Sequence, residues 1–292
     1  MTDSTVETPD PASWIGRRRT SKDRITLRTA HFMQQTMDLE PDLEPGAPLP
    51  LAWHWLYFLE TARTSESGRD GHPLRGGFLP PVSLPRRMWA GSRLEFHAPI
   101  RIGDTVVRNS EIRSVVNKEG RSGKLCFVTV NHSYDCDGRQ LLSEEHDIVY
   151  REDPVSGSQM REPAGPKSPL AQQNLITERL VEPSASLLFR YSALTFNTHR
   201  IHYDVDYCRQ VEGYPGLVVH GPLIATLLLD LLVAEFGQDN VQRFRFRAIS
   251  PLFADRPFHL NLGSSDTGYR LWATNANGNV AVEASAELKT ST

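Results

Sequence analysis

The stretch GPLIATLLLDLLVAEFG, from Gly221 to Gly237, is the part of the sequence from which the fold can be derived. Pro222 suits the first turn of a helix and Gly237 suits its end, and leucines and isoleucine recur between them at helical spacing. Apolar residues cover nearly every side of this helix, so we expect it to be buried, and it is too short to span a bilayer. The sequence therefore predicts a helix that other elements enclose.

Strand-like blocks follow this helix and also fill the first half of the chain. Each half holds two blocks of alternating residues and one hairpin signal, which is Asp137-Gly138 in the first half and Asn277-Gly278 in the second. The blocks are residues 93–116, 124–150, 243–263 and 269–288, and a second helix is expected over residues 48–62, before the first pair. A helix followed by antiparallel strands, twice over, predicts an α+β fold in which a curved sheet surrounds a central helix.

A segment in the middle of the chain divides it into two halves. Residues 153–173 are rich in proline, glycine, serine and glutamine and have no apolar periodicity, which is typical of a linker. We therefore expect a flexible N-terminus over 1–20, an N-terminal repeat over 21–152, a linker over 153–178 and a C-terminal repeat over 179–292.

Composition excludes several classes of protein. The chain has 292 residues, of which 39% are hydrophobic and 23% charged, and its net charge of −3 gives no reason to expect a nucleic-acid or membrane partner. Cys126, Cys136 and Cys208 are too few and too scattered for a disulfide framework or a zinc site. The acidic, polar start of the chain is unlike a secretory signal. We expect a cytoplasmic protein that needs no cofactor.

Three histidines gather just before the buried helix. His199 and His202 lie in a polar run, and His220 precedes Gly221, where unpaired backbone N–H groups and the helix dipole favour an oxyanion. A single histidine is more often structural, but structural histidines need not gather around a helix start. A metal site built from His199, His202 and Asp204 is the alternative, although no Glu-x-x-His pattern or paired carboxylates support it. A nucleophilic triad lacks its Gly-x-Ser-x-Gly elbow.

The stretch YSALTFNTHRIHYDVDYCRQVEGYPGLVVHGPL, residues 191–223, resembles the hydratase motif of the MaoC-like, R-specific enoyl-CoA hydratases. With HWLYFLE (residues 54–60) and GRDGHPLRGGFLPPVSLPRRMWAGSRLEF (residues 68–96), it is similar to a narrower branch. That branch contains the mesaconyl-C4-CoA hydratases, the itaconyl-CoA hydratases and the type 2 3-hydroxyacyl-thioester dehydratases. The resemblance implies a double hotdog, with a C-terminal repeat that carries the motif and an N-terminal repeat that shapes the acyl pocket.

The resemblance also implies roles for single residues. His202 is the proton-transfer group, and the Gly221 N–H stabilises the oxyanion of the thioester. Asn197 stands where the wider family has an aspartate, and its amide can orient a water but cannot accept a proton. His199 and Asp204 are further candidates for orienting His202.

Substrate-binding residues are expected on both sides of the motif. His220 lies at the helix start, and Arg200 could clamp the second carboxylate of a dicarboxylic acyl-CoA or contact a CoA phosphate. Arg86 and Arg87, in the Gly/Pro-rich residues 76–91, are candidates for phosphate or carboxylate contacts.

The activity implied is hydration or dehydration of a short, dicarboxylic enoyl-CoA such as mesaconyl-C4-CoA or itaconyl-CoA. A 3-hydroxyacyl-thioester dehydratase of fatty acid synthesis, an acyl-CoA-binding module without catalysis and a hotdog thioesterase are the alternatives. The partner is an acyl-CoA thioester, and an exposed sheet edge or helix face could also join two chains into a homodimer.

Overall fold

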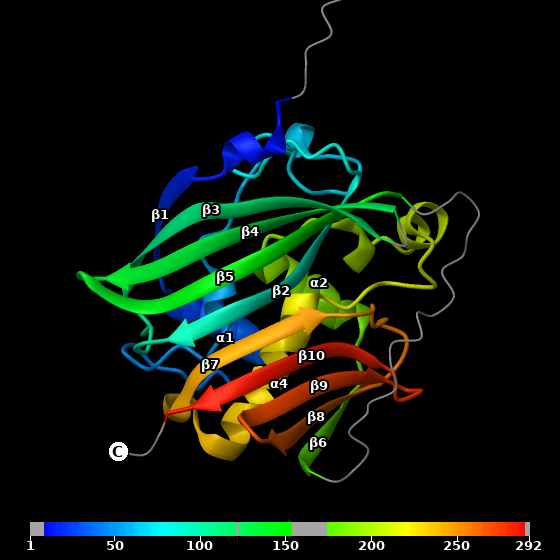
Figure 1. Ribbon diagram of the computed structural model, residues 1–292. Helices are drawn as coiled ribbons and strands as arrows, with labels where there is room; N and C mark the ends of the chain where they lie inside the picture. The colour runs from blue at the N-terminus through cyan, green and yellow to red at the C-terminus, as the bar shows by residue number, and fades with distance from the viewer. Residues whose placement is uncertain (1–8, 121–122, 154–173, 290–292) are drawn as a thin grey trace, which may run out of the picture.

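A computed structural model describes residues 9–120, 123–153 and 174–289. In these residues the strands form one antiparallel sheet of ten strands in the order β1-β3-β4-β5-β2-β7-β10-β9-β8-β6 (Figure 1). Their bounds are β1 Arg18–Arg24, β2 Arg86–Phe96, β3 Thr105–Gly120, β4 Gly123–Cys136, β5 Arg139–Arg151, β6 Leu175–Val181, β7 Val241–Ala248, β8 Phe258–Ser265, β9 Gly268–Asn275 and β10 Val280–Leu288. The sheet is continuous because β2 of the first half pairs with β7 of the second.

Helices are few beside this sheet. The α-helices are α1 Leu27–Thr36, α2 Ala185–Leu194, α3 Val205–Tyr207 and α4 Gly221–Phe236. The short helices are η1 Pro11–Trp14, η2 Trp53–Leu56, η3 Thr64–Glu66, η4 Arg200–His202, η5 Cys208–Glu212 and η6 Gln238–Asn240. Among the described residues, none of these helices combines the length and the apolar character that crossing a membrane requires.

The seam between β2 and β7 depends on a glycine. Gly91 lies at a bulge in β2 and opposes Arg247 of β7. A Cβ atom at Gly91 would lie 2.3 Å from the carbonyl oxygen of Phe246, so only glycine lets the two backbones approach this closely.

The predicted helix over Gly221 to Gly237 is confirmed as α4, which lies against the sheet (Figure 1). Nine of its side chains are buried, and Gly237 has a positive φ just after its end. The main core joins α4 to side chains of both halves, such as Tyr134 of β4 and Phe244 of β7. Burial of this apolar stripe stabilises the helix far more than its intrinsic propensity does.

The predicted helix over residues 48–62 is wrong. The only helical part of this segment is the 3-10 turn η2, and Ala52 and Phe58 on either side of it have the positive φ values of 67° and 56°. Pro50 also removes a backbone donor. The aromatic side chains of this segment are instead buried against the sheet as a short irregular coil. A helix that the sequence did not predict, α1, lies nearby on the N-terminal side.

Both predicted hairpins are confirmed. Asp137 and Gly138 turn between β4 and β5 with positive φ, and Gly278 does so between β9 and β10. Strand β1 begins at Arg18, inside the N-terminus that was expected to be flexible, and β2 begins at Arg86, within the Gly/Pro-rich residues 76–91. Most of the predicted linker lies outside the described residues, and its last part belongs to strand β6.

Candidate active site

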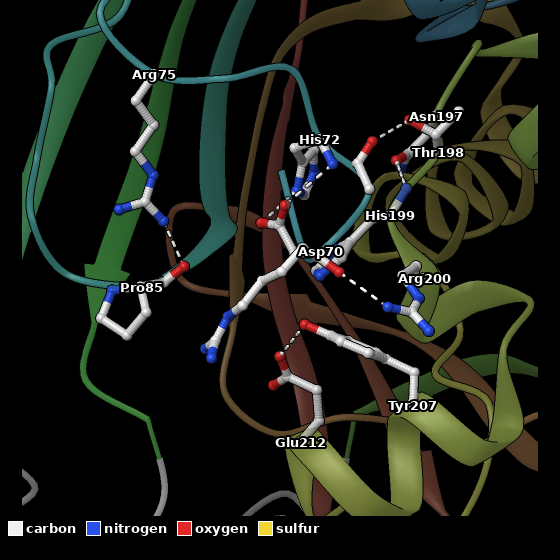
Figure 2. Close-up of polar contacts among 12 residues, drawn as sticks. Asp70, His72, Arg75, Pro85, Asn197, Thr198, His199, Arg200, Tyr207 and Glu212 are labelled. Carbon is white, nitrogen blue, oxygen red and sulfur yellow. Dashed lines mark hydrogen bonds and ion pairs between the residues drawn. The ribbon is translucent and has the colours of Figure 1, made fainter. Parts of the chain in front are cut away.

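The motif segment enters the site through α2. The side chain of Ser184 caps α2 by accepting a hydrogen bond from the N–H of Leu187, and the helix ends at Leu194. Phe196 then turns the chain with a φ of 48°. Asn197 Oδ1 accepts the N–H of His199 at 3.0 Å, which fixes the next turn (Figure 2). The side-chain carbonyl of Asn197 therefore shapes the backbone, and the amino group of the same side chain can donate to a ligand.

His202 is buried, and one of its ring nitrogens forms a hydrogen bond to the backbone. Its Nδ1 lies 2.7 Å from the carbonyl oxygen of Val218. A carbonyl can only accept, so Nδ1 carries the proton and Nε2 is an acceptor. Burial lowers the pKa of His202 to about 4, against a raising effect of the hydrogen bond to Val218. At neutral pH the ring is therefore neutral, and it can take a proton on Nε2.

His220 stacks on His202 at the start of α4. The ring centroids lie 3.6 Å apart with an interplanar angle of 18°. The Nε2 atom of His220 pairs with the Ser192 hydroxyl at 2.8 Å, and its buried Nδ1 has no hydrogen-bond partner in the described part of the chain. The next residue, Gly221, opens the helix, and a Cβ added to it would meet nothing within 4 Å. The helix start therefore borders open space on the side of Gly221.

His199 joins these rings to a loop of the N-terminal half. Its ring centroid lies 5.5 Å from that of His202 and 4.2 Å from that of His72. His72 in turn pairs through Nδ1 with the carboxylate of Asp70 at 3.1 Å. Burial lowers the pKa of His199 well below its usual range, and the neighbouring His72 adds to this. The site is thus a row of imidazoles that ends on a carboxylate.

Asp70 and His72 were not identified from the sequence. Their segment was recognised only as part of the family resemblance, because nothing local connects GRDGH to a motif some 130 residues later. The sole signal was the pairing of a carboxylate and an imidazole in a glycine-rich loop. The fold is what brings this pair against His199.

Arg200 is already engaged within the chain. Its guanidinium pairs with Asp204 Oδ2 through Nε and Nη2, at 3.0 and 2.7 Å, and its Nη1 donates to the carbonyl of Arg69 at 3.1 Å. Asp204 also caps the backbone N–H of Tyr207 at 2.9 Å. Arg200, which was expected to bind the substrate, and Asp204, which was expected to orient His202, instead pair with each other and hold the motif loop together. The side chain of Arg200 remains 39% exposed.

The neighbours Arg86 and Arg87 have different surroundings. Arg86 is buried, forms an ion pair with Glu212 and donates to the Tyr214 hydroxyl at 2.9 Å. It therefore joins β2 to η5 and the residue Tyr214 that follows it. Arg87 pairs in register with Tyr150 of β5, and its positive charge helps to lower the pKa of His72. Of the two arginines, Arg87 is the one whose charge acts on the imidazole row.

The proposed metal trio does not assemble, because Asp204 is paired with Arg200. The described residues nearest to a metal-ligand arrangement are Asp70, His72 and His199, whose donor atoms lie within 4.8 Å of one another. The direct hydrogen bond between Asp70 and His72 already uses one potential metal-ligand atom of each residue, Oδ2 of Asp70 and Nδ1 of His72. We therefore interpret this group as a hydrogen-bonded pair beside a third ring.

A second buried polar cluster lies in the N-terminal half around Glu144. Its Oε1 accepts from Trp55 Nε1 and the Ser92 hydroxyl, and its Oε2 accepts from the Tyr134 hydroxyl and pairs with His54 Nε2, all within 3.0 to 3.2 Å. Burial raises the pKa of Glu144, but the hydrogen bond and charge of His54 outweigh this and hold it well below its usual range. Four partners leave this carboxylate little capacity for a ligand.

Comparison with known proteins places the chain in a family. Residues 52–254 match the family model for hydroxyacyl-thioester dehydratase type 2. The chain is 44% identical to a mesaconyl-C4-CoA hydratase of Chloroflexus aurantiacus, covering 97% of this chain and 99% of the relative. It is 30% identical to the mitochondrial hydroxyacyl-thioester dehydratase type 2 of Schizosaccharomyces pombe, covering 81% of this chain and 82% of the relative.

Solved structures share the fold at low identity. A MaoC-like dehydratase superposes with a TM-score of 0.71 at 15% identity, covering 97% of this chain and all of the other. A Mycobacterium tuberculosis protein with a double hotdog fold gives a TM-score of 0.53 at 13% identity, covering 94% and 96%. The predicted double hotdog is confirmed, and the chain belongs to the hydroxyacyl-thioester dehydratase type 2 family of MaoC-like hotdog proteins.

Proposed function

We propose that the protein is a hydro-lyase that reversibly adds water across the α,β double bond of a short enoyl-CoA, with mesaconyl-C4-CoA as its substrate. The 44% identity to a mesaconyl-C4-CoA hydratase over nearly the whole chain supports this reaction and this acyl group. One observation carries the proposal. His202 is a neutral imidazole whose Nε2 can accept a proton, and the start of α4 at Gly221 borders open space.

The start of α4 supplies the electrostatic part of the reaction. Hydration places negative charge on the thioester oxygen as the enolate forms. The Gly221 N–H belongs to the first turn, where N–H groups lack partners within the helix and the dipole favours an anion. A thioester carbonyl in the open space beside Gly221 would accept this hydrogen bond.

His202 supplies the proton transfer. As the oxygen of water bonds to the β-carbon, one of its O–H bonds breaks and the proton goes to Nε2 of His202. The electron pair of the double bond moves toward the thioester, and the imidazolium then protonates the α-carbon. One water is added and the ring returns to its neutral form. Asn197 holds the water through its amino group, since its carbonyl is engaged by His199.

The second carboxylate of the acyl group needs a cation that the chain has not already neutralised. Arg200 is paired with Asp204, and Arg86 with Glu212. Arg87 lies in register with Tyr150, which belongs to the smaller core of the N-terminal half, and its charge acts on His72 and His199. We therefore assign the carboxylate contact to Arg87 in place of Arg200.

A fatty-acyl dehydratase is the second candidate, favoured by the match to the dehydratase family model. Mesaconyl-C4-CoA, itaconyl-CoA and crotonyl-CoA should be offered in parallel, following enoyl absorbance and free thiol release. Rapid loss of absorbance with the dicarboxylic substrates supports the proposal, and turnover of crotonyl-CoA or longer chains alone moves the protein to the alternative. Thiol release would indicate a thioesterase.

The CoA thioester is the only partner that this function requires. The cytoplasmic location and the homodimer expected from the sequence stay predictions. Light scattering of the purified chain tests the homodimer directly.

A further inference from the structure

The site lacks a carboxylate where the motif of the wider family has one. Position 197 is an asparagine whose Oδ1 is used by the N–H of His199. The proton that leaves water must nevertheless reside on an imidazole during the reaction, and a buried imidazolium needs a nearby negative charge. Around His202 the first partner is only the carbonyl of Val218, which carries no net charge.

A loop of the N-terminal half brings a carboxylate to this place. The carbonyl of Asp70 accepts the N–H of Arg200 at 2.9 Å, and the carbonyl of Gly71 accepts the Thr198 hydroxyl (Figure 2). A Cβ at Gly71 would lie 1.9 Å from the Thr198 carbonyl oxygen, so the two backbones are in direct contact. The loop is therefore docked onto the motif by main-chain contacts, and the Asp70 side chain is 12% exposed.

The side chain of Asp70 orients His72. One carboxylate oxygen accepts the His72 backbone N–H at 3.1 Å, and the other lies 3.1 Å from its Nδ1. Although burial raises the pKa of Asp70, the His72 hydrogen bond holds it below its usual value, so the carboxylate is ionised at neutral pH. An ionised carboxylate only accepts, which places the proton of His72 on Nδ1. His72 and His202 thus share one tautomer, but only His72 has a carboxylate partner.

We propose that Asp70, acting through His72, is the counter-charge of the row formed by His72, His199 and His202, and takes over the electrostatic role of the carboxylate missing at Asn197. Asp70 and His72 are positioning residues in this account: the proton from water is taken at His202, and the negative charge of Asp70 stabilises the positive charge on the row. The inference rests on the proposed function, because it concerns the same reaction.

The pH dependence separates this role from a structural one. The charged or titratable groups that face the row of His72, His199 and His202 are Asp70, Arg75, Arg87 and His220. Removing only the anion leaves the two arginines in place, so the pKa of the imidazoles falls. The acidic limb of kcat/KM then moves to lower pH in the Asp70→Asn variant. A loop that was merely loosened would lower the rate at every pH without moving the limb.

The decisive variant is Asp70→Asn. The asparagine side chain can still accept the hydrogen bond from the His72 backbone N–H, but it carries no negative charge. We expect kcat for mesaconyl-C4-CoA to fall about 100-fold with little change in KM. Adding Asn197→Asp should restore at least tenfold of this loss, because that aspartate can still cap His199 and returns a carboxylate to the motif. Asp153→Asn is the matched control: Asp153 pairs with Arg69 of the same loop at the surface, and the variant should behave as wild type.

The outcomes are distinguishable. A wild type that hydrates the substrate, with an Asp70→Asn variant of unchanged kcat and acidic limb, would overturn this inference and leave the proposed function intact. A wild type inactive on every enoyl-CoA would overturn the proposed function itself. If Asp70→Asn fails to fold cooperatively, His72→Gln tests the same pair. Activity that is lost on EDTA treatment and restored by zinc would show that the group acts as a metal site, against the inference.

Discussion

The two buried polar clusters have similar components and opposite arrangements. Around Glu144, a carboxylate is surrounded by four partners, and both of its oxygens are occupied. Around His202, a neutral ring has one occupied nitrogen, and the stacked His220 has a buried nitrogen without a partner in the described residues. Unused hydrogen-bonding capacity beside open space therefore separates a reactive cluster from a structural one more clearly than burial or the presence of histidine does.

The largest effect is expected at the open cluster. His202→Ala removes the proton-transfer group, so kcat for enoyl-CoA hydration should fall about 1000-fold while thermal unfolding stays cooperative. His97→Ala, at an exposed histidine that pairs with Ser143, is the control and should keep wild-type activity. A His202→Ala variant that retains a tenth of the wild-type rate would remove His202 from this role.

The closed cluster should respond in stability instead. Glu144→Gln leaves His54 without its anionic partner and cannot accept all four hydrogen bonds, which should cost about 3 kcal/mol in the free energy of unfolding. Glu145→Gln, one residue along and paired with Arg93 at the surface, should cost less than about 1 kcal/mol. Denaturant melts give both values. Equal effects, or a loss of kcat in folded Glu144→Gln, would break the contrast between the clusters.

The docked loop offers a smaller test. Gly71→Ala should lower kcat about tenfold, because its Cβ would push the loop away from Thr198. Gly76→Ala is a matched control: both glycines have a φ of +90°, so both variants carry the same backbone strain, but at Gly76 the nearest atom is 3.8 Å away. Similar kinetics for the two variants would show that docking against the motif does not matter to catalysis.

The smallest effect is expected at Arg200. Because its guanidinium is paired with Asp204, Arg200→Met should change KM for mesaconyl-C4-CoA and for crotonyl-CoA by less than about threefold each. Arg87→Met should raise KM about tenfold for the dicarboxylic substrate alone. The opposite result, with selectivity lost at Arg200, would return the carboxylate clamp to the motif.

Local signals in the sequence were enough to predict part of this architecture. Pro222, Gly237 and the stripe between them predicted α4, and the two X-Gly turns predicted the hairpins, because those residues determine backbone geometry locally. The histidines next to α4 could be identified because they are close in sequence. The helix expected over residues 48–62 failed because its apolar residues are buried by the sheet, while positive φ values at Ala52 and Phe58 stop a helix.

The rest depended on contacts between distant segments. Asp70 reaches the motif only because β2 and β7 join the halves and the loop is docked onto residues 198–200. Glu144 lies in the polar run SEEHD, which resembles an exposed strand, and its burial follows from Trp55 and Tyr134 packing around it. No local pattern carries such information.

In the proposed reaction, the imidazole row at the start of α4 adds water to an enoyl thioester. The most direct measurement is mass spectrometry of mesaconyl-C4-CoA incubated with the wild type in ¹⁸O-labelled water. We expect an intact CoA thioester that has gained one labelled water, formed about 1000-fold more slowly with His202→Ala. Unchanged substrate, or free CoA with the label in the released acid, would contradict it.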